Sequence, residues 1–270
     1  MRIAATSDLH APLGAWNSRI DATLLDAEPD VLVIAGDLFN WMPNPRHGLL
    51  ERLRFYSEID VPVLAVLGNH DLRLQGGGEC ALQRLTGLFP DNGVHCLDNA
   101  PYVHDGVGFV GCHGWYDSSL VADKGYTLTE LNRCAYDLGE RRHARWNAPD
   151  SVLAAKCLDK MRDDFARIEC DDCVAVTHYI PLVSGLSHLG DYELQLHDAV
   201  MGSASYGAWY EKEPGITLAL WGHRHWPFGR QYDSFLGCNV AYHQRFPLTV
   251  LDKTSSGWKR TLWPCPDNKC

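Results

Sequence analysis

The chain has 270 residues, of which 46% are hydrophobic and 21% are charged, and its formal net charge at pH 7 is −10. This composition is ordinary for a globular protein, and the negative charge argues against strong binding to nucleic acid or to an anionic membrane surface. No apolar run reaches the roughly 20 residues of a membrane-spanning helix, and the first residues lack the apolar core of a secretory signal. We therefore expect a cytoplasmic protein whose ten cysteines are mostly free thiols.

Short apolar runs alternate with amphipathic stretches in the first part of the chain, a pattern typical of β-α-β units. Strands are predicted at residues 2–7, 31–35 and 63–67. Helices are predicted between these strands, at 16–27 and about 45–59. Two short runs, around 94–97 and 108–111, indicate a further pair of strands. The glycine run 76–78 has no Lys-Ser or Lys-Thr after it, so it is predicted to be a loop rather than a nucleotide-binding P-loop.

The second part of the chain continues the same alternation after a long helical region. That region covers roughly 119–168 and is broken near Pro149. The elements predicted after it are strands at 173–177 and 216–221, a helix at about 203–211, and antiparallel strands that include 248–252 and 259–263. We expect residues 1–270 to form a single domain, with a mainly helical insertion around 118–170.

Polar side chains follow each of the five main apolar strands. They are Asp8 and His10, then Asp37, then Asn69, His70 and Asp71, then His178, and last His223 and His225. Because the carboxyl ends of strands in α/β folds share one edge of the sheet, these side chains are expected to meet in one cleft. Each motif alone has a plain structural reading, such as a helix cap or a turn. Together, so many imidazoles and carboxylates would repel or stay unsatisfied without a metal, so the set predicts a metal site at the strand ends.

The motifs also resemble a known family. Asp8-x-His10, Gly36-Asp37, Gly68-Asn69-His70-Asp71, Thr177-His178 and Gly222-His223-x-His225 are similar, in the same order, to the five-motif signature of the calcineurin-like metallophosphoesterases. The segments Gly114-Trp115-Tyr116-Asp117 and "MGSAS" resemble uncharacterised bacterial members of that family. The resemblance implies an α/β fold built as a four-layer α/β/β/α sandwich, with two mixed β-sheets flanked by helices.

The same resemblance implies a binuclear metal centre. Asp37 takes the position that bridges two divalent ions. Asp8, His10 and His225 would complete one site, while Asn69, His178 and His223 would complete the other. The ligand set has no thiolate, which suits Mn, Fe or Zn without choosing among them. Such a pair of ions supports attack on a phosphoester by a metal-bound hydroxide.

The resemblance assigns different roles to the residues beside the ligands. His70 would contact the phosphate, together with Asn69, and would protonate the leaving oxygen. Asp71 would orient the His70 ring as its carboxylate partner. These assignments make His70 and Asp71 the predicted catalytic residues.

Departures from the branches of the family narrow the substrate. Protein phosphatases carry Asp-Arg-Gly shortly after the second motif, whereas this chain continues "GDLFNWMPN", and Asp71 stands where those enzymes usually have Glu. Arg46 and Arg73 are cations that the sequence does not place at the cleft. A small phosphoester of about nucleotide size is expected as the partner, with a diester favoured over a monoester. The alternative is a catalytically silent metal-binding scaffold, although such relatives typically lose metal ligands or the equivalent of His70.

Several other residues have competing interpretations. Trp115 and Tyr116 could line a base-binding wall, but burial over the core is favoured. Among the histidines outside the motifs, His113 is the main candidate for a further role because of its neighbours. Cys170 and Cys173 form a single CxxC pair, without the second pair that a zinc ribbon needs.

Overall fold

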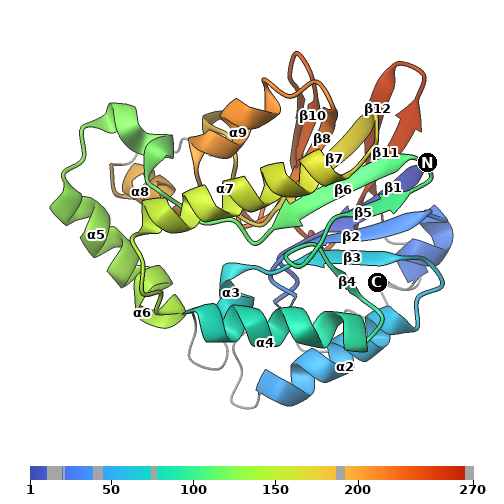
Figure 1. The fold of residues 1–270 in the computed structure, drawn as a ribbon, viewed down its shortest axis with the longest axis horizontal. Coiled ribbons are helices and arrows are strands. Elements are labelled where there is room, and N and C mark those ends of the chain that lie inside the picture. The colour runs from blue at the N-terminus through green and yellow to red at the C-terminus, as the bar shows by residue number, and fades with distance from the viewer. Residues whose placement is uncertain (11–19, 21, 39–44, 74–77, 187–191, 265–270) are drawn as a thin grey trace.

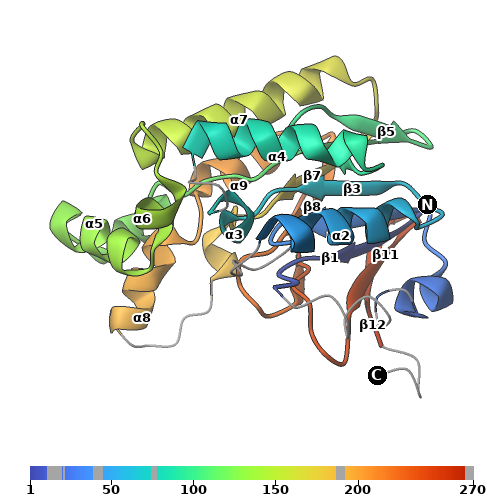
Figure 2. The same ribbon diagram turned by 90° about the horizontal axis from the view of Figure 1, so that it is seen from below.

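The computed structural model describes the chain except for residues 11–19, 21, 39–44, 74–77, 187–191 and 265–270, and except for the side chains of 45–49 and 192–194. Two six-stranded mixed sheets pack face to face, and helices cover the outer face of each (Figures 1 and 2). This arrangement is the predicted four-layer α/β/β/α sandwich. No helix in the described ranges combines the length and the apolarity needed to cross a membrane.

The first sheet has the strand order β12-β11-β1-β2-β3-β4. Its strands are β1 (Arg2–Thr6), β2 (Val31–Ala35), β3 (Val63–Val66), β4 (His95–Cys96), β11 (Leu248–Thr254) and β12 (Gly257–Trp263). Strands β1 to β4 are mutually parallel, and β11 pairs antiparallel with β1. The carboxyl ends of β1, β2 and β3 therefore lie at one edge of this sheet.

The second sheet has the strand order β5-β6-β7-β8-β10-β9. Its strands are β5 (Tyr102–His104), β6 (Val107–Cys112), β7 (Asp172–Thr177), β8 (Ile216–Trp221), β9 (Phe228–Gln231) and β10 (Leu236–Asn239). Strands β6, β7, β8 and β10 are parallel. The predicted pair of strands near 94–97 and 108–111 thus exists as β4 and β6, but the two belong to different sheets.

The helices cover the outer faces of the two sheets, and a smaller group lies beyond the sheet ends (Figure 1). They are α2 (Pro45–Ser57), α3 (Asn69–Leu72), α4 (Gly78–Asp91), α5 (Leu128–Asp137), α6 (Glu140–Ala144), α7 (Asp150–Arg167), α8 (Tyr192–His197) and α9 (Ala204–Tyr210), with 3-10 turns at Ser119–Lys124, Val183–Gly185 and Asp198–Val200. Helices α2 and α4 pack on the first sheet, and α7 and α9 pack on the second. The break predicted near Pro149 is confirmed, because this residue is the N-cap of α7.

Alternation along the strands explains the layers. Ile3 and Ala5 of β1 face the second sheet and join the core between the sheets, while Ala4 points to the opposite side and packs with helices α2 and α4. Successive residues of a strand point to opposite faces, so a strand buried on both sides reads as a continuous apolar run. This is why the central strands could be predicted from short apolar segments.

The structure differs from the sequence-based prediction at α4, and it describes the predicted helix at 16–27 only in part. Helix α4 begins at Gly78, the last residue of the predicted glycine loop, and buries Ala81, Leu85 and Phe89 at four-residue spacing. Residues 76 and 77 of that loop lie outside the described part of the chain. No helix was predicted there, although this spacing is typical of one. The predicted helix at 16–27 is helical at 20 and 22–27, and its other residues fall outside the described part of the chain.

Candidate metal centre

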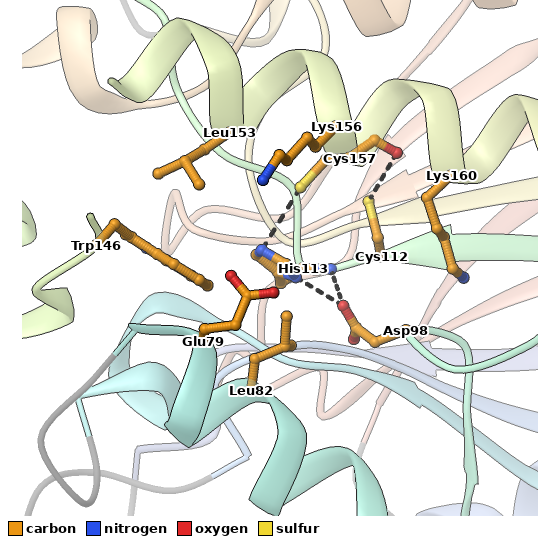
Figure 3. A pocket seen from close by; sticks show the side chains of 10 residues that line it. All are labelled: Glu79, Leu82, Asp98, Cys112, His113, Trp146, Leu153, Lys156, Cys157 and Lys160. Atoms are coloured by element: carbon orange, nitrogen blue, oxygen red, sulfur yellow. Dashed lines mark hydrogen bonds and ion pairs between the residues drawn. The ribbon is translucent and has the colours of Figure 1, made fainter. Parts of the chain in front are cut away.

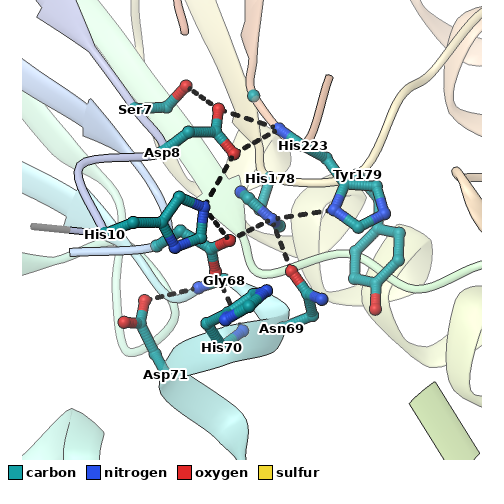
Figure 4. Close-up of polar contacts among 12 residues, drawn as sticks. Ser7, Asp8, His10, Gly68, Asn69, His70, Asp71, His178, Tyr179 and His223 are labelled. Carbon is teal, nitrogen blue, oxygen red and sulfur yellow. Dashed lines mark hydrogen bonds and ion pairs between the residues drawn. The ribbon is translucent and has the colours of Figure 1, made fainter. Parts of the chain in front are cut away.

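The structure brings all the predicted ligands to one place, at the carboxyl ends of strands from both sheets. Figure 4 shows Asp8, His10, Asn69, His178 and His223 there. The first sheet supplies Asp8 and His10 after β1, Asp37 after β2 and Asn69 after β3. The second sheet supplies His178 after β7, and His223 and His225 after β8. Each sheet therefore contributes part of the centre, and neither could form it alone.

The backbone at this centre adopts a conformation that L-amino acids avoid. Asp8, His10, Asp37 and His223 have positive φ angles of 56°, 35°, 53° and 69°. Left-handed residues of this kind cost about 1–3 kcal/mol each and concentrate at functional sites. Close packing adds a glycine requirement, because a Cβ at Gly68 would lie 2.0 Å from Asp37 Oδ1. The turns thus direct several polar side chains into a very small volume.

The first group of ligands is Asp8, His10 and His225, whose ligand atoms lie within 4.8 Å of one another. Asp8 Oδ1 is 3.5 Å from His225 Nε2 and 3.9 Å from His10 Nε2. Ser7 Oγ donates to Asp8 Oδ2 at 2.6 Å, and the backbone N–H of His223 donates to both carboxylate oxygens at 3.1 Å. The His225 side chain is 62% exposed, so this group opens to solvent.

The second group consists of Asp37, Asn69, His178 and His223. Several of their oxygen and nitrogen atoms face one another at short distances, an arrangement that a proton or a metal ion between them would satisfy. His178 Nδ1 lies 2.9 Å from the carbonyl oxygen of Ala35, which places a proton on Nδ1. His178 Nε2 then faces Asn69 Oδ1 at 2.9 Å, Asp37 Oδ2 at 3.4 Å and His223 Nδ1 at 3.2 Å. Burial would lower the pKa of His178, but the Asp37 and Asp8 carboxylates raise it to about 9. Either an extra proton or a metal ion satisfies this group, so the donor set fits a metal.

Asp37 lies between the two groups. Its Oδ2 is 3.4 Å from both His10 Nε2 and His178 Nε2, and its Oδ1 accepts the backbone N–H of His70 at 2.9 Å. Burial opposes ionisation of this carboxyl, yet the nearby imidazoles, chiefly His178, hold its pKa well below the usual range. A buried, ionised carboxylate between two imidazole groups has the position required of a ligand shared by two ions.

His70 lies at the same centre, and its ring is in edge contact with that of His10 at a centroid distance of 4.5 Å (Figure 4). Burial lowers the pKa of His70 to about 4. Arg73 NH1 lies 3.4 Å from His70 Nε2, and an arginine can only donate, so His70 is neutral here and Nε2 accepts. His10, Asp37 and His70 also form a group that could hold an ion, which makes His70 a candidate ligand as well as the predicted acid.

Asp71 is fully buried next to the loop that carries Asn69 and His70. Its Oδ2 accepts the backbone N–H of Gly68 at 2.7 Å and that of Leu38 at 3.3 Å. Burial and the neighbouring Asp37 carboxylate raise the pKa of Asp71. These contacts fix the turn between β3 and α3, and thereby the direction of the side chains that follow it.

Glu140 contacts a predicted ligand and was not among the residues predicted from the sequence. Its Oε1 accepts from Asn69 Nδ2 and from Arg73 NH2, each at 2.8 Å, and its Oε2 accepts from Tyr179 Oη at 2.9 Å. Because Glu140 engages the amide nitrogen of Asn69, the amide oxygen turns toward His178. Glu140 belongs to α6, inside the predicted helical insertion, and no local pattern in the sequence links it to a residue 71 positions away.

Trp115 and Tyr116 have the role that was favoured for them. Their exposed fractions are 0% and 2%, so they cover the core rather than line an open wall. Trp226, which follows His225, is a large aromatic side chain that is 68% exposed. Arg46 has no described side chain, whereas Arg73 reaches His70, as described above.

Comparisons with known proteins agree with this geometry. The sequence profile of the calcineurin-like phosphoesterases matches residues 1–227. No curated protein matches the chain. The structure of a phosphopantetheinyl hydrolase from Mycobacterium tuberculosis is similar, with a TM-score of 0.67 at 20% identity, and the match covers 99% of this chain and 97% of that one.

Two further solved structures share the fold. A protein from Thermus thermophilus has a TM-score of 0.60 at 16% identity, with 97% of this chain and 98% of that one covered. A dimetal phosphatase from Danio rerio has a TM-score of 0.56 at 12% identity, with 98% of both chains covered. Identities this low establish the fold, while the family profile spans most of the sequence. The chain therefore belongs to the calcineurin-like phosphoesterase family and is a metal-dependent phosphoester hydrolase.

Proposed function

We propose that the chain is a cytoplasmic phosphodiesterase that acts on small, nucleotide-sized diesters, and that residues 1–270 form its single domain with an inserted helical region. The proposed ligands of one ion are Asp8, His10, Asp37 and His225, and those of the other are Asp37, Asn69, His178 and His223. When bound, such ions supply an activated water and hold the phosphate. The oxygen and nitrogen donors suit Mn, Fe or Zn. The eight described cysteines are all free thiols, which is consistent with a reducing compartment.

The ion pair between Arg73 and Glu140 is the observation that supports a preference for diesters over monoesters. A monoester brings a second negative charge that a diester lacks, and an enzyme specific for monoesters needs a free cation to bind it. Arg73 is the cation that contacts His70, but its NH2 is 2.8 Å from Glu140 Oε1. The Glu140 side chain is 5% exposed, so this charge is neutralised within the protein.

His70 is the proposed acid, and Asn69 and His70 are the proposed contacts to the phosphate. The neutral His70 of the substrate-free protein has its Nε2 bonded to Arg73. An anionic phosphate beside His70 would favour the protonated ring, so substrate binding itself would supply the acid with its proton. Asp71 would then act on His70 through the turn that it holds.

A pocket beside the centre supports a substrate with a second substituent on its phosphate. The pocket has a volume of about 190 Å³ and is lined in part by Arg224, Trp226 and Phe228. Arg224 and Trp226 flank His225 in the sequence, which supports a position of the pocket next to the first ligand group. The exposed indole ring of Trp226 suits a planar base, while the Arg224 guanidinium is held by an ion pair with the buried Asp198.

The proposed function is tested by comparing an aryl phosphodiester with the corresponding aryl monoester, with added Mn²⁺ and with EDTA. We expect faster turnover of the diester and complete loss of activity in EDTA. Glu140→Gln should release Arg73 and shift the ratio of diester to monoester kcat/KM toward the monoester by on the order of tenfold, the scale of one charge-assisted contact. The matched control is Glu79→Gln, which changes an exposed glutamate of α4. A metal-loaded protein inert on both esters, or a ratio unchanged by Glu140→Gln, contradicts the proposal.

The contribution of the pocket is tested with Trp226→Ala. Stacking of a base on an aromatic ring is worth about 1–3 kcal/mol, so KM for a nucleotide diester should rise by roughly fivefold to 100-fold. KM for a methyl aryl diester, which has no base, should stay close to its original value. Tyr136→Ala, at an aromatic residue of α5 that is 56% exposed, serves as the control. An equal effect on both diesters would show that Trp226 does not contact the base.

A further inference from the structure

A second cavity, with a volume of about 170 Å³, lies between α4 and α7 (Figure 3). Its lining includes Asp98, His113 and Trp146, and the thiols of Cys112 and Cys157. None of the proposed metal ligands lines it. The proposed phosphodiesterase activity therefore gives no role to this group of titratable side chains.

Three of these side chains form a relay. Asp98 Oδ1 lies 2.7 Å from His113 Nδ1 and also accepts the backbone N–H of His113 at 2.6 Å. The carboxylate thus fixes the proton on Nδ1 and leaves the lone pair on Nε2. His113 Nε2 lies 3.5 Å from Cys157 Sγ. A thiol, an imidazole and a carboxylate in this order form the arrangement that activates nucleophiles in hydrolytic triads.

The surroundings of the relay favour a base-assisted reaction. Burial would raise the pKa of Asp98, but the hydrogen bond from His113 lowers it, so the carboxylate is ionised. The neighbouring Cys112 thiol and burial raise the pKa of Cys157. Cys157 therefore keeps its proton at rest, and attack by its sulfur requires a proton acceptor in contact with it. His113 Nε2 is in that position.

The second thiol and the size of the cavity limit the reactant. The Cys112 thiol donates to the carbonyl oxygen of Cys157, with 3.6 Å between Sγ and that oxygen, so the two cysteines lie side by side. Cys157 and Cys112 are 6% and 3% exposed, so a reactant must enter the cavity to reach them. A water molecule takes up about 30 Å³ in the liquid, so the cavity has room for a molecule of only a few heavy atoms.

We propose that Cys157 is a reactive-thiol site for small hydroperoxides, with His113 as its base, Asp98 as the positioning residue and Cys112 as the resolving thiol. Cys157 Sγ attacks one peroxide oxygen while its proton passes to His113 Nε2, and the O–O bond breaks. The sulfur is oxidised to a sulfenic acid, and the peroxide is reduced to a leaving oxygen that takes the proton from His113 and departs as water or an alcohol. The Cys112 sulfur then attacks Cys157 Sγ, so that an S–S bond forms and the hydroxyl group leaves with the Cys112 proton as water.

The experiment treats the full chain, loaded with redox-inert Zn²⁺, with hydrogen peroxide, and follows each cysteine by alkylation and peptide mass spectrometry. Cys157 is expected to be consumed at least about tenfold faster than Cys80, which is exposed but belongs to no such relay. The product should be a disulfide between Cys157 and Cys112, and Cys112→Ser should stop the reaction at the sulfenic acid. Faster oxidation of Cys80 than of Cys157 overturns the proposal. This comparison within one chain requires no substitution at the relay.

The role of His113 is tested with His113→Gln. General base catalysis is worth typically ~10²–10⁴-fold, so oxidation of Cys157 should slow by on the order of 10², while Cys80 reacts as before. His95→Gln is the matched control, because His95 is a partly buried histidine that bonds a carbonyl oxygen rather than a thiol. A folded His113→Gln protein in which Cys157 reacts at the original rate overturns the assignment.

Discussion

Replacing Asp37 with alanine is expected to remove both metal ions together and to reduce turnover by at least on the order of 10³. The reason is its position, with Oδ2 at 3.4 Å from an imidazole of each ligand group. Removing a shared ligand leaves each ion with an incomplete set, and the ions contribute several kcal/mol to catalysis. Elemental analysis after reconstitution should find close to two ions per original chain and close to none in the variant.

Two further variants test whether the loss of both ions is specific to Asp37. Asn69→Ala should weaken mainly the second site, because Asn69 contacts His178 and belongs to the second group alone. Asp105→Ala controls for the loss of an aspartate with a positive φ, since Asp105 has a φ of 47° and a side chain that is 75% exposed. It should retain both ions. An Asp37→Ala protein that keeps one ion at full occupancy would refute the shared position.

Replacing His70 with asparagine is expected to lower turnover by ~10²–10⁴-fold while the metal content stays unchanged. The loss should depend on the leaving group, because an alkoxide needs a proton as it departs and an acidic phenol does not. On an activated aryl diester the defect should therefore shrink sharply. The measurement compares kcat for alkyl and aryl diesters, with metal content determined on the same samples.

The outcome separates three roles for His70. Loss of metal would make it a ligand, which its grouping with His10 and Asp37 allows. An equal loss of rate on both substrates would make it a residue that positions the phosphate. His104→Asn, at a histidine of β5 far along the sequence from every motif, should change neither metal content nor rate.

Most residues of the metal centre could be predicted from the sequence because they directly follow buried strands. A buried strand has the pattern of an apolar run, and the residue after it lies at the sheet edge, so local pattern alone predicts that Asp8 and Asp37 converge. His178 follows a strand of the second sheet, and its place beside them was implied by the family resemblance. Glu140 could not be found in this way. Its contact with Asn69 joins helix α6 to a strand end across 71 residues, and the chain carries no periodic signal for that contact.

The secondary structure also divides into elements that a local sequence pattern predicts and elements that it does not. Strands β9 and β10 were not predicted individually, since β9 has exposed residues and β10 contains a glycine and an asparagine that weaken the apolar pattern. The relay of Asp98, His113 and Cys157 also depends on contacts between distant segments. The sequence singled out His113 by its neighbours, but the partners of its ring come from positions 15 and 44 residues away.

The division of the ligands between the sheets has a consequence for the stability of the whole molecule. Each proposed ion takes ligands from both halves of the sandwich, so a bound ion would act as a cross-link between them. The unfolded chain has no such preformed set, and the free energy of binding therefore adds to the free energy of unfolding. The free energy of unfolding therefore rises with the concentration of free metal, by RT ln(1 + [M]/Kd) for each site. The melting temperature of the protein should depend on that concentration as well. A cell short of metal would lose this enzyme by unfolding as well as by inactivity.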